Sequence, residues 1–190
     1  PKLTKKIVKR GVTELVTPGV TYNDTVLNYS ENNFLACVDL QEKISGISFL
    51  DVSTGEFFVA QGTNDYLDKL IQSLKPSEII IQREKLDSFK QLFGEKYFLQ
   101  TYEQWIFTPD FTTDLLLKHF KTSSLKGFGI DDFINGKIAA GVILHYLNET
   151  HHEQLNHISS ISRIEEDNYV WLDRFTIRNL ELVSSANEKA

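Results

Sequence analysis

The feature that most constrains the fold of this chain is a change in the spacing of its apolar residues near position 63. Before this point, three short apolar runs at 33–40, 46–52 and 56–60 are separated by brief polar turns, which is typical of an antiparallel meander. After it, apolar residues recur at the spacing of a helix, beginning with Leu67, Leu70, Ile71 and Leu74.

Strands and helices alternate beyond that point. Short apolar runs at 78–81 and 97–99 predict buried strands, and helical spacing predicts helices over 84–93, 111–120 and 132–149. A meander followed by this alternation indicates an α/β fold, with a mixed sheet flanked by helices. Further on, the sequence predicts a hairpin over 159–172 and a helix over 174–188.

Composition adds limits on size and compartment. Apolar residues make up 41% of the 190 residues, enough for a core, and the single cysteine, Cys37, excludes an intrachain disulfide. No apolar run approaches the ~20 residues of a membrane helix, so we expect a cytoplasmic protein with no membrane contact. The chain begins at Pro1 and lacks methionine, from which we expect a piece of a longer protein or a processed one.

Charge is unevenly distributed along the chain. Residues 1–10 hold four lysines, one arginine and no acidic residue, and so contribute +5 to a formal net charge of −6. The remainder therefore carries −11, which argues against a DNA-binding domain because tight nucleic-acid binding neutralises phosphates with cations. We interpret residues 1–10 as a solvated segment, with contact to a DNA backbone as the alternative.

Three carboxylates on the predicted meander could form a nuclease site. A sheet that held Asp39, Asp51 and Glu56 together could bind two magnesium ions for phosphodiester cleavage. The alternative is structural, because an aspartate that opens a turn such as 51–55 commonly accepts backbone hydrogen bonds. We favour the turn and predict no catalytic residue.

Other groups are weaker candidates for chemistry. Cys37 lies inside an apolar run, where thiols are usually inert packing groups. No phosphate-binding loop is present, so the chain is not expected to hydrolyse ATP. No two histidines lie four residues apart, so we predict a solvated helix end, and no metal site, for the cluster of His145, Glu149, His151, His152, Glu153 and His157.

Residues 15–20, 46–57 and 172–182 resemble blocks of the MutS family of mismatch-repair proteins. Residues 15–20 (Leu-Val-Thr-Pro-Gly-Val) resemble the opening of the family's connector domain, and 46–57 resemble its central hairpin. Residues 172–182 resemble the start of the core, or lever, domain and form the most specific match. Further similar blocks occur in the family's order at 125–129, 139–141, 146–150 and 155–158.

This resemblance implies a domain plan. Residues 1–10 would be the linker from a mismatch-binding domain, and 11–156 would be the connector, MutS domain II. The connector would have a ribonuclease-H-like fold without the nuclease's carboxylate site. Residues 157–190 would be a partial segment of the α-helical core domain, MutS domain III.

The resemblance also implies a function. The whole protein would be a homodimer that binds mismatched double-stranded DNA and uses ATP and magnesium, held by another domain, to recruit MutL. The connector would bind no cofactor of its own; it would relay conformational change between domains and offer a docking surface to MutL. The alternative is a family paralogue that acts in recombination.

One short match is misleading. The family reads mismatches with a Phe-x-Glu wedge, and Phe93-Gly94-Glu95 fits that pattern. The family's wedge belongs to the mismatch-binding domain, in a different sequence context. We therefore interpret Phe93 as the end of a helix, with Gly94 following it.

Overall fold

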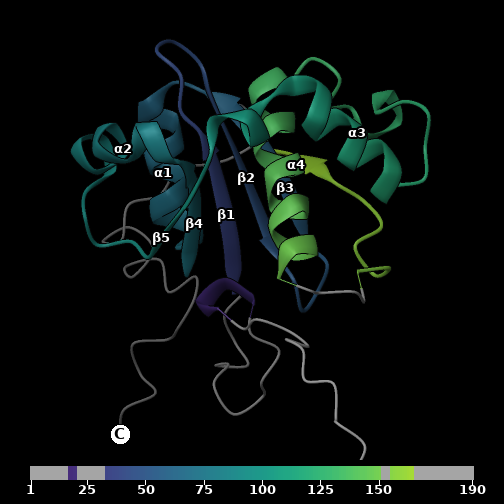
Figure 1. Ribbon diagram of the computed structural model, residues 1–190, viewed down its shortest axis with the longest axis horizontal. Coiled ribbons are helices and arrows are strands. Elements are labelled where there is room, and N and C mark those ends of the chain that lie inside the picture. The colour runs from purple at the N-terminus through teal and green to yellow at the C-terminus, as the bar shows by residue number, and fades with distance from the viewer. Residues whose placement is uncertain (1–16, 21–32, 151–154, 165–190) are drawn as a thin grey trace, which may run out of the picture.

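The three apolar runs of the meander form the first strands of a mixed sheet in the computed structural model, which describes residues 17–20, 33–150 and 155–164. The strands are β1 (Phe34–Asp39), β2 (Ser45–Asp51) and β3 (Phe57–Gly62). They pair antiparallel in sequence order, as predicted. Every residue of β1 and β2 is buried, because helices cover both faces of the sheet (Figure 1).

Helices and parallel strands then alternate. α1 (Asn64–Leu74) leads to β4 (Glu78–Gln82), which pairs parallel with β1. α2 (Leu86–Phe93) leads to β5 (Leu99–Tyr102), which pairs parallel with β4. α3 (Pro109–His119) and α4 (Ile134–Glu149) follow. Short 3₁₀ helices occur at Pro18–Val20 (η1), Arg83–Lys85 (η2), Gln104–Phe107 (η3) and Lys126–Phe128 (η4).

The strand order is β5-β4-β1-β2-β3-β6, and β2 is the strand that runs antiparallel to its neighbours. Within this order, β3-β2-β1-β4-β5 is the ribonuclease-H-like arrangement that the family resemblance implies. The predicted fold class, a mixed sheet with flanking helices, is confirmed.

The sixth strand lies within the stretch 159–172, where the sequence predicts a hairpin. β6 (Ser162–Arg163) pairs parallel with β3, so these residues extend the sheet. The predicted second arm and the helix at 174–188 lie outside the described residues, as do residues 1–10. Ile158 and Ile161, which the domain plan gives to the next domain, are buried in this core. The boundary after residue 156 stays a prediction.

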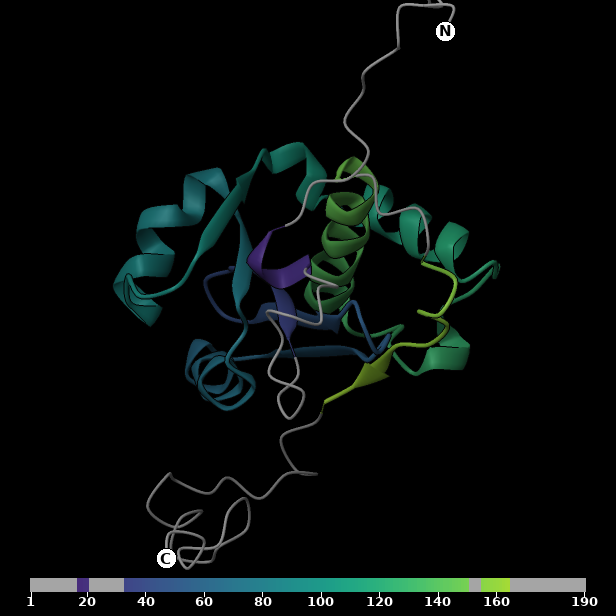
Figure 2. The ribbon, with the colours of Figure 1, turned by 90° about the horizontal axis from the view of Figure 1, so that it is seen from below.

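Two apolar cores lie on opposite faces of the sheet. Helix α1 packs on one face and α4 on the other, as Figure 2 shows from below. Alternation along β1 sends Leu35 and Cys37 to the α4 face and Ala36 and Val38 to the α1 face. One sheet thus separates two cores that share few side chains.

Helix α4 lies directly against the sheet at its N-terminal end. A Cβ on Gly46 of β2 would lie 2.1 Å from the Asn135 carbonyl carbon, so the two backbones touch where a side chain would otherwise stand. Further along, a Cβ on Gly141 would lie 2.5 Å from the Thr112 Cβ of α3. Glycine at these positions is therefore a packing requirement.

Candidate functional site

The carboxylates considered for a nuclease site do not meet. Asp39 pairs with Gly46 and Asp51 pairs with Phe34, so the two acids lie at opposite ends of the β1–β2 pair. The step from one end of β1 to the other spans roughly 17 Å at ~3.4 Å per residue. They also point to opposite faces, because Asp39 follows the alternation of Leu35 and Cys37 while Asp51 pairs with Phe34 of the α1 side.

Asp51 holds the β2–β3 turn. Its Oδ1 accepts hydrogen bonds from the Ser53 amide at 2.9 Å, the Ser53 hydroxyl at 2.6 Å and the Thr54 amide at 3.2 Å. Its Oδ2 accepts a hydrogen bond from the Asn33 amide at 3.1 Å. These donors confirm the turn interpretation of Asp51, since they occupy the lone pairs that a metal ion would need.

Asp39 is buried at the other end of β1, with 1% of its surface exposed. Burial raises the pKa of its carboxyl to about 6, while a hydrogen bond from Gln41 and the charge of Lys85 act in the opposite direction. Gln41 Nε2 donates to Oδ1 at 2.9 Å, and Oδ2 has no hydrogen-bond partner in the described part of the chain. Asp39 is thus an isolated buried acid.

Cys37 is a packing residue, as predicted. The side chain is fully buried in the core on the α4 face. Burial raises the pKa of its thiol well above the ordinary value, and the nearby charge of Asp39 adds to this shift. A thiol held neutral in this way is a poor nucleophile.

The two described histidines of the predicted cluster lie apart. The imidazole of His145 has its Nε2 3.3 Å from Glu149 Oε1 and packs edge-on against the rings of Tyr102, Trp105 and Phe111. His157 Nε2 lies 2.7 Å from the carbonyl oxygen of Val52. Across 17–20, 33–150 and 155–164, no three His, Cys, Asp or Glu side chains gather as a metal site would require. His151, His152 and Glu153 lie outside the described residues.

Phe93, the first residue of the wedge-like tripeptide, is also a core residue. It is 7% exposed, and its ring centroid lies 4.7 Å from that of Phe89. Gly94 follows at φ +91 and ends α2, as the sequence indicated. A buried ring at this position has no access to a DNA base step.

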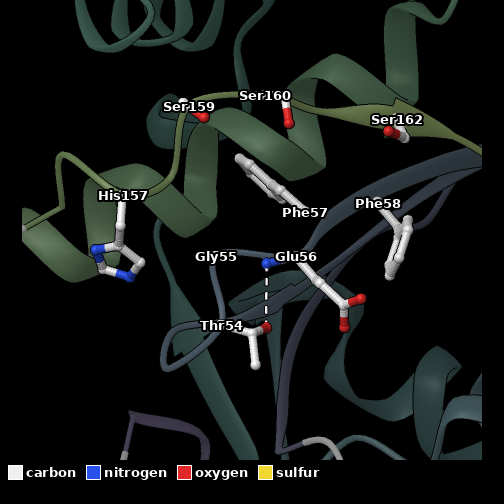
Figure 3. A pocket seen from close by; sticks show the side chains of 9 residues that line it. All are labelled: Thr54, Gly55, Glu56, Phe57, Phe58, His157, Ser159, Ser160 and Ser162. Atoms are coloured by element: carbon white, nitrogen blue, oxygen red, sulfur yellow. Dashed lines mark hydrogen bonds between the residues drawn. The ribbon is translucent and has the colours of Figure 1, made fainter.

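A surface hollow of about 360 Å³ lies between the β2–β3 turn and the segment that leads into β6 (Figure 3). Glu56 lies on its wall, and its amide donates a hydrogen bond to the Thr54 hydroxyl at 3.3 Å. The hydroxyls of this wall come from Thr54 in the turn, from Ser159 and Ser160 in the irregular segment before β6, and from Ser162 in β6. The lining residues are Thr54, Gly55, Glu56, Phe57, Phe58, His157, Ser159, Ser160 and Ser162.

A different buried carboxylate joins three distant parts of the chain. Glu78, the first residue of β4, is fully buried. Its Oε1 accepts a hydrogen bond from the Tyr146 hydroxyl of α4 at 2.8 Å. Its Oε2 accepts hydrogen bonds from the Thr17 hydroxyl at 2.5 Å and the Gly19 amide at 3.0 Å. We call residues 17–20 the leading segment and this meeting point the Glu78 junction.

The leading segment is fitted closely to the sheet. A Cβ on Gly19 would lie 3.0 Å from the Glu78 Cβ and 3.1 Å from the Leu35 Cβ, so a larger residue would push these neighbours away. Val20 is fully buried in the core on the α4 face, and Asn33 Nδ2 donates to the Pro18 carbonyl at 2.9 Å. Figure 2 shows the leading segment in purple beside α4.

The Tyr146 hydroxyl completes the junction from the helix side. Burial raises the pKa of Tyr146 above its ordinary range, and the adjacent Glu78 adds to the rise. The hydroxyl therefore stays protonated and serves as a donor to Glu78. Its oxygen also lies 2.8 Å from the Thr17 hydroxyl oxygen, so the leading segment and α4 touch directly.

Comparison with known families decides what kind of domain this is. The family described as MutS domain II matches residues 33–159. The chain belongs to the MutS family. The match covers strands β1 to β5 and helices α1 to α4, and it confirms the resemblance found in the sequence blocks.

Curated MutS relatives align with nearly the whole chain. The DNA mismatch repair protein MutS of Cytophaga hutchinsonii is 58% identical over 185 residues, which cover 97% of this chain and 22% of that protein. MutS of Flavobacterium psychrophilum is 55% identical over 190 residues, 100% of this chain and 22% of that protein. The chain therefore spans about a fifth of the length of these MutS proteins.

One solved structure resembles this MutS domain only weakly. A mutant nuclease domain of the large terminase subunit gp2 of bacterial virus Sf6 matches with a TM-score of 0.32 and 10% identity. The match covers 80% of this chain and 70% of that one. A likeness this distant says nothing about function.

Within the described ranges, no helix is long and apolar enough to cross a membrane.

Proposed function

We propose that this connector domain relays movement between the domains on either side of it in a MutS-type mismatch repair protein, and that it offers a docking surface to MutL. Its role is mechanical and associative, with no catalytic residue of its own. The whole protein would act in the cytoplasm as a homodimer on mismatched double-stranded DNA. ATP and magnesium would be bound by another of its domains.

The observation that carries the relay is the Glu78 junction. The leading segment comes from the N-terminal side of the chain, and Tyr146 lies in the last turn of α4, close to where the chain leaves the described helices. Packed side chains and hydrogen-bond networks can carry coupling between the incoming and outgoing segments of a domain. Glu78 supplies that contact from the start of β4.

Two alternatives have less support. A stand-alone nuclease would need Asp39, Asp51 and Glu56 at one point, but Asp39 and Asp51 occupy opposite ends and faces of the sheet. A paralogue acting in recombination would share the connector fold. The relatives cited above, at 55–58% identity, carry the name of the mismatch repair protein, which favours repair.

A binding titration tests the docking part of the proposal. The 190-residue chain is titrated with MutL from a bacterium of known MutS, such as Cytophaga hutchinsonii, and with mismatched and matched duplex DNA in parallel. We expect saturable binding to MutL and no preference for mismatched DNA. The full-length MutS of the same bacterium, with ATP, is the positive control. If it binds MutL while the chain neither binds nor competes, the docking surface lies elsewhere.

A further inference from the structure

The Glu78 junction places one carboxylate between the leading segment and the last turn of α4. Each of its oxygens accepts hydrogen bonds from a different segment. Oε1 accepts from the Tyr146 hydroxyl, and Oε2 accepts from the Thr17 hydroxyl and the Gly19 amide. The carboxylate is fully buried, so water does not replace a donor that withdraws. The donors on either side therefore share a single acceptor group.

Sharing makes the two attachments interdependent. If Tyr146 withdraws, Oε1 loses its donor inside the protein, and the carboxylate is left with donors on one side only. A buried charge with fewer hydrogen bonds is less stable, so the carboxylate shifts to recover solvent or a new donor. Either response weakens the hydrogen bonds that the leading segment donates to Oε2. The same reasoning applies in reverse when the leading segment withdraws, because coupling between sites is reciprocal.

The leading segment also has contacts that do not involve Glu78. Val20 is buried in the core, Pro18 accepts a hydrogen bond from Asn33, and the Thr17 hydroxyl lies 2.8 Å from that of Tyr146. The two hydrogen bonds to Glu78 add to this attachment, and their loss is expected to loosen the segment while the sheet stays folded.

We propose that Glu78 is a latch that couples the attachment of the leading segment to the position of the last turn of α4, each stabilising the other through the one buried carboxylate. This inference rests on the proposed relay and names the residue that carries it. Glu78 acts through Tyr146 and Thr17, and is thus a positioning residue.

Amide hydrogen exchange in the 190-residue chain tests the latch from both sides. The Gly19 amide reports on the leading segment, and the Thr150 amide, which donates to the Tyr146 carbonyl at 2.9 Å, reports on the end of α4. We expect Tyr146→Phe to speed exchange at Gly19 about tenfold, the effect of losing one charge-assisted hydrogen bond. Thr17→Val is expected to speed exchange at Thr150 by a similar factor.

Glu78→Gln shows whether the coupling passes through the carboxylate. Glutamine keeps the shape but can accept from one side only, so in this background Tyr146→Phe and Thr17→Val should each add less than about twofold. The matched control is Tyr97→Phe, which removes a tyrosine hydroxyl on the α1–α2 side of the sheet. It should leave both amides unchanged.

Three results would overturn the latch. The first is a Gly19 rate in Tyr146→Phe no faster than in Tyr97→Phe. The second is an undiminished cross-effect in the Glu78→Gln background, which would assign the coupling to the direct Thr17–Tyr146 contact. The third is an equal acceleration of the β1 and β2 amides, which would make Glu78 a global stabiliser. If Glu78→Gln fails to fold, the absence of either cross-effect, of Tyr146→Phe on Gly19 or of Thr17→Val on Thr150, still refutes the latch.

The exchange experiment uses neither MutL nor DNA, so its outcome is independent of the proposed function. Cross-effects found without MutL binding would keep the latch and remove the docking role. MutL binding without cross-effects would do the reverse. To test the relay itself, the matching glutamate is changed to glutamine in a full-length MutS, and the response of its ATPase to a mismatch is compared with that of the unmodified protein.

Discussion

Asp39 makes the stability of this domain depend on pH in an unusual direction. Burial raises the pKa of the carboxyl from its ordinary value of 3.8 to about 6 in the folded chain. Between these values the folded state holds a proton that the unfolded state releases. Stability contributed by the protonated acid is therefore lost as pH rises from about 4 to 6 and stays low above that, the reverse of a salt-bridged aspartate.

The size of the effect follows from the shift. About two pKa units at 1.36 kcal/mol each give about 3 kcal/mol between pH 4 and pH 7.5. Asp39→Asn removes the ionisation and keeps an acceptor for Gln41. The amide nitrogen of the asparagine takes the position of Oδ2, which has no hydrogen-bond partner in the described part of the chain. Burying this group without a partner lowers the free energy of unfolding by roughly 1–3 kcal/mol at every pH. Relative to that of the unmodified chain, the free energy of unfolding of the variant should therefore rise by about 3 kcal/mol between pH 4 and pH 7.5.

Urea unfolding at half-unit steps from pH 4 to 7.5 measures this difference. Asp131→Asn, at an exposed position, is the matched control and should follow the unmodified chain at every pH. If the curves of Asp39→Asn and the unmodified chain stay parallel over this range, Asp39 does not ionise at a raised pKa and its burial carries no charge penalty. Parallel curves would refute the reasoning even if the variant were more stable throughout.

Other substitutions test the packing and the turn. Leu147→Ala empties a fully buried position of α4 and should lower the unfolding free energy by about 2–5 kcal/mol in urea titrations; an unchanged midpoint would contradict the packing of α4. Gly46→Ala places a Cβ 2.1 Å from the Asn135 backbone, so we expect a loss of about 1–3 kcal/mol and faster exchange at the Asn135 amide, which donates to Gln61 Oε1. Asp51→Ala removes the acceptor of the Ser53 and Thr54 amides and should cost about 1–3 kcal/mol, with faster exchange at those two amides and an unchanged rate at Gly19.

The sequence predicted those parts of the fold that depend on local pattern. The meander was readable because its apolar runs are short and its turns are polar, and the helices because Leu67, Leu70 and Ile71 form one stripe. β5 was expected at 97–99 but spans Leu99–Tyr102, because Tyr97 packs on Phe89 of α2 before the strand begins. A strand was expected near β6, within the hairpin predicted over 159–172, but its pairing with β3 was not, because β3 lies about a hundred residues earlier.

One part of the candidate site was predictable from the local sequence: the turn at Asp51, whose Oδ1 accepts a hydrogen bond from the Ser53 amide. The expected lack of metal and nuclease sites stays a prediction. Glu78 was missed because its partners Thr17, Gly19 and Tyr146 are 61, 59 and 68 residues away. The available signal was Glu78 itself, a charged residue at the start of a largely apolar strand. This signal does not indicate which donors form hydrogen bonds with the buried carboxylate.

The close contact of α4 with β2 at Gly46 is a point about which the helix can rotate. The helix touches the sheet backbone near Asn135, while Tyr146 sits eleven residues further on, at about 17 Å by the ~1.5 Å rise per residue. A tilt of about 5° about that contact would carry the Tyr146 end by roughly 1.5 Å over this length. That displacement is half the length of the hydrogen bond to Glu78, so a small rotation at one end of α4 becomes the breaking of a bond at the other.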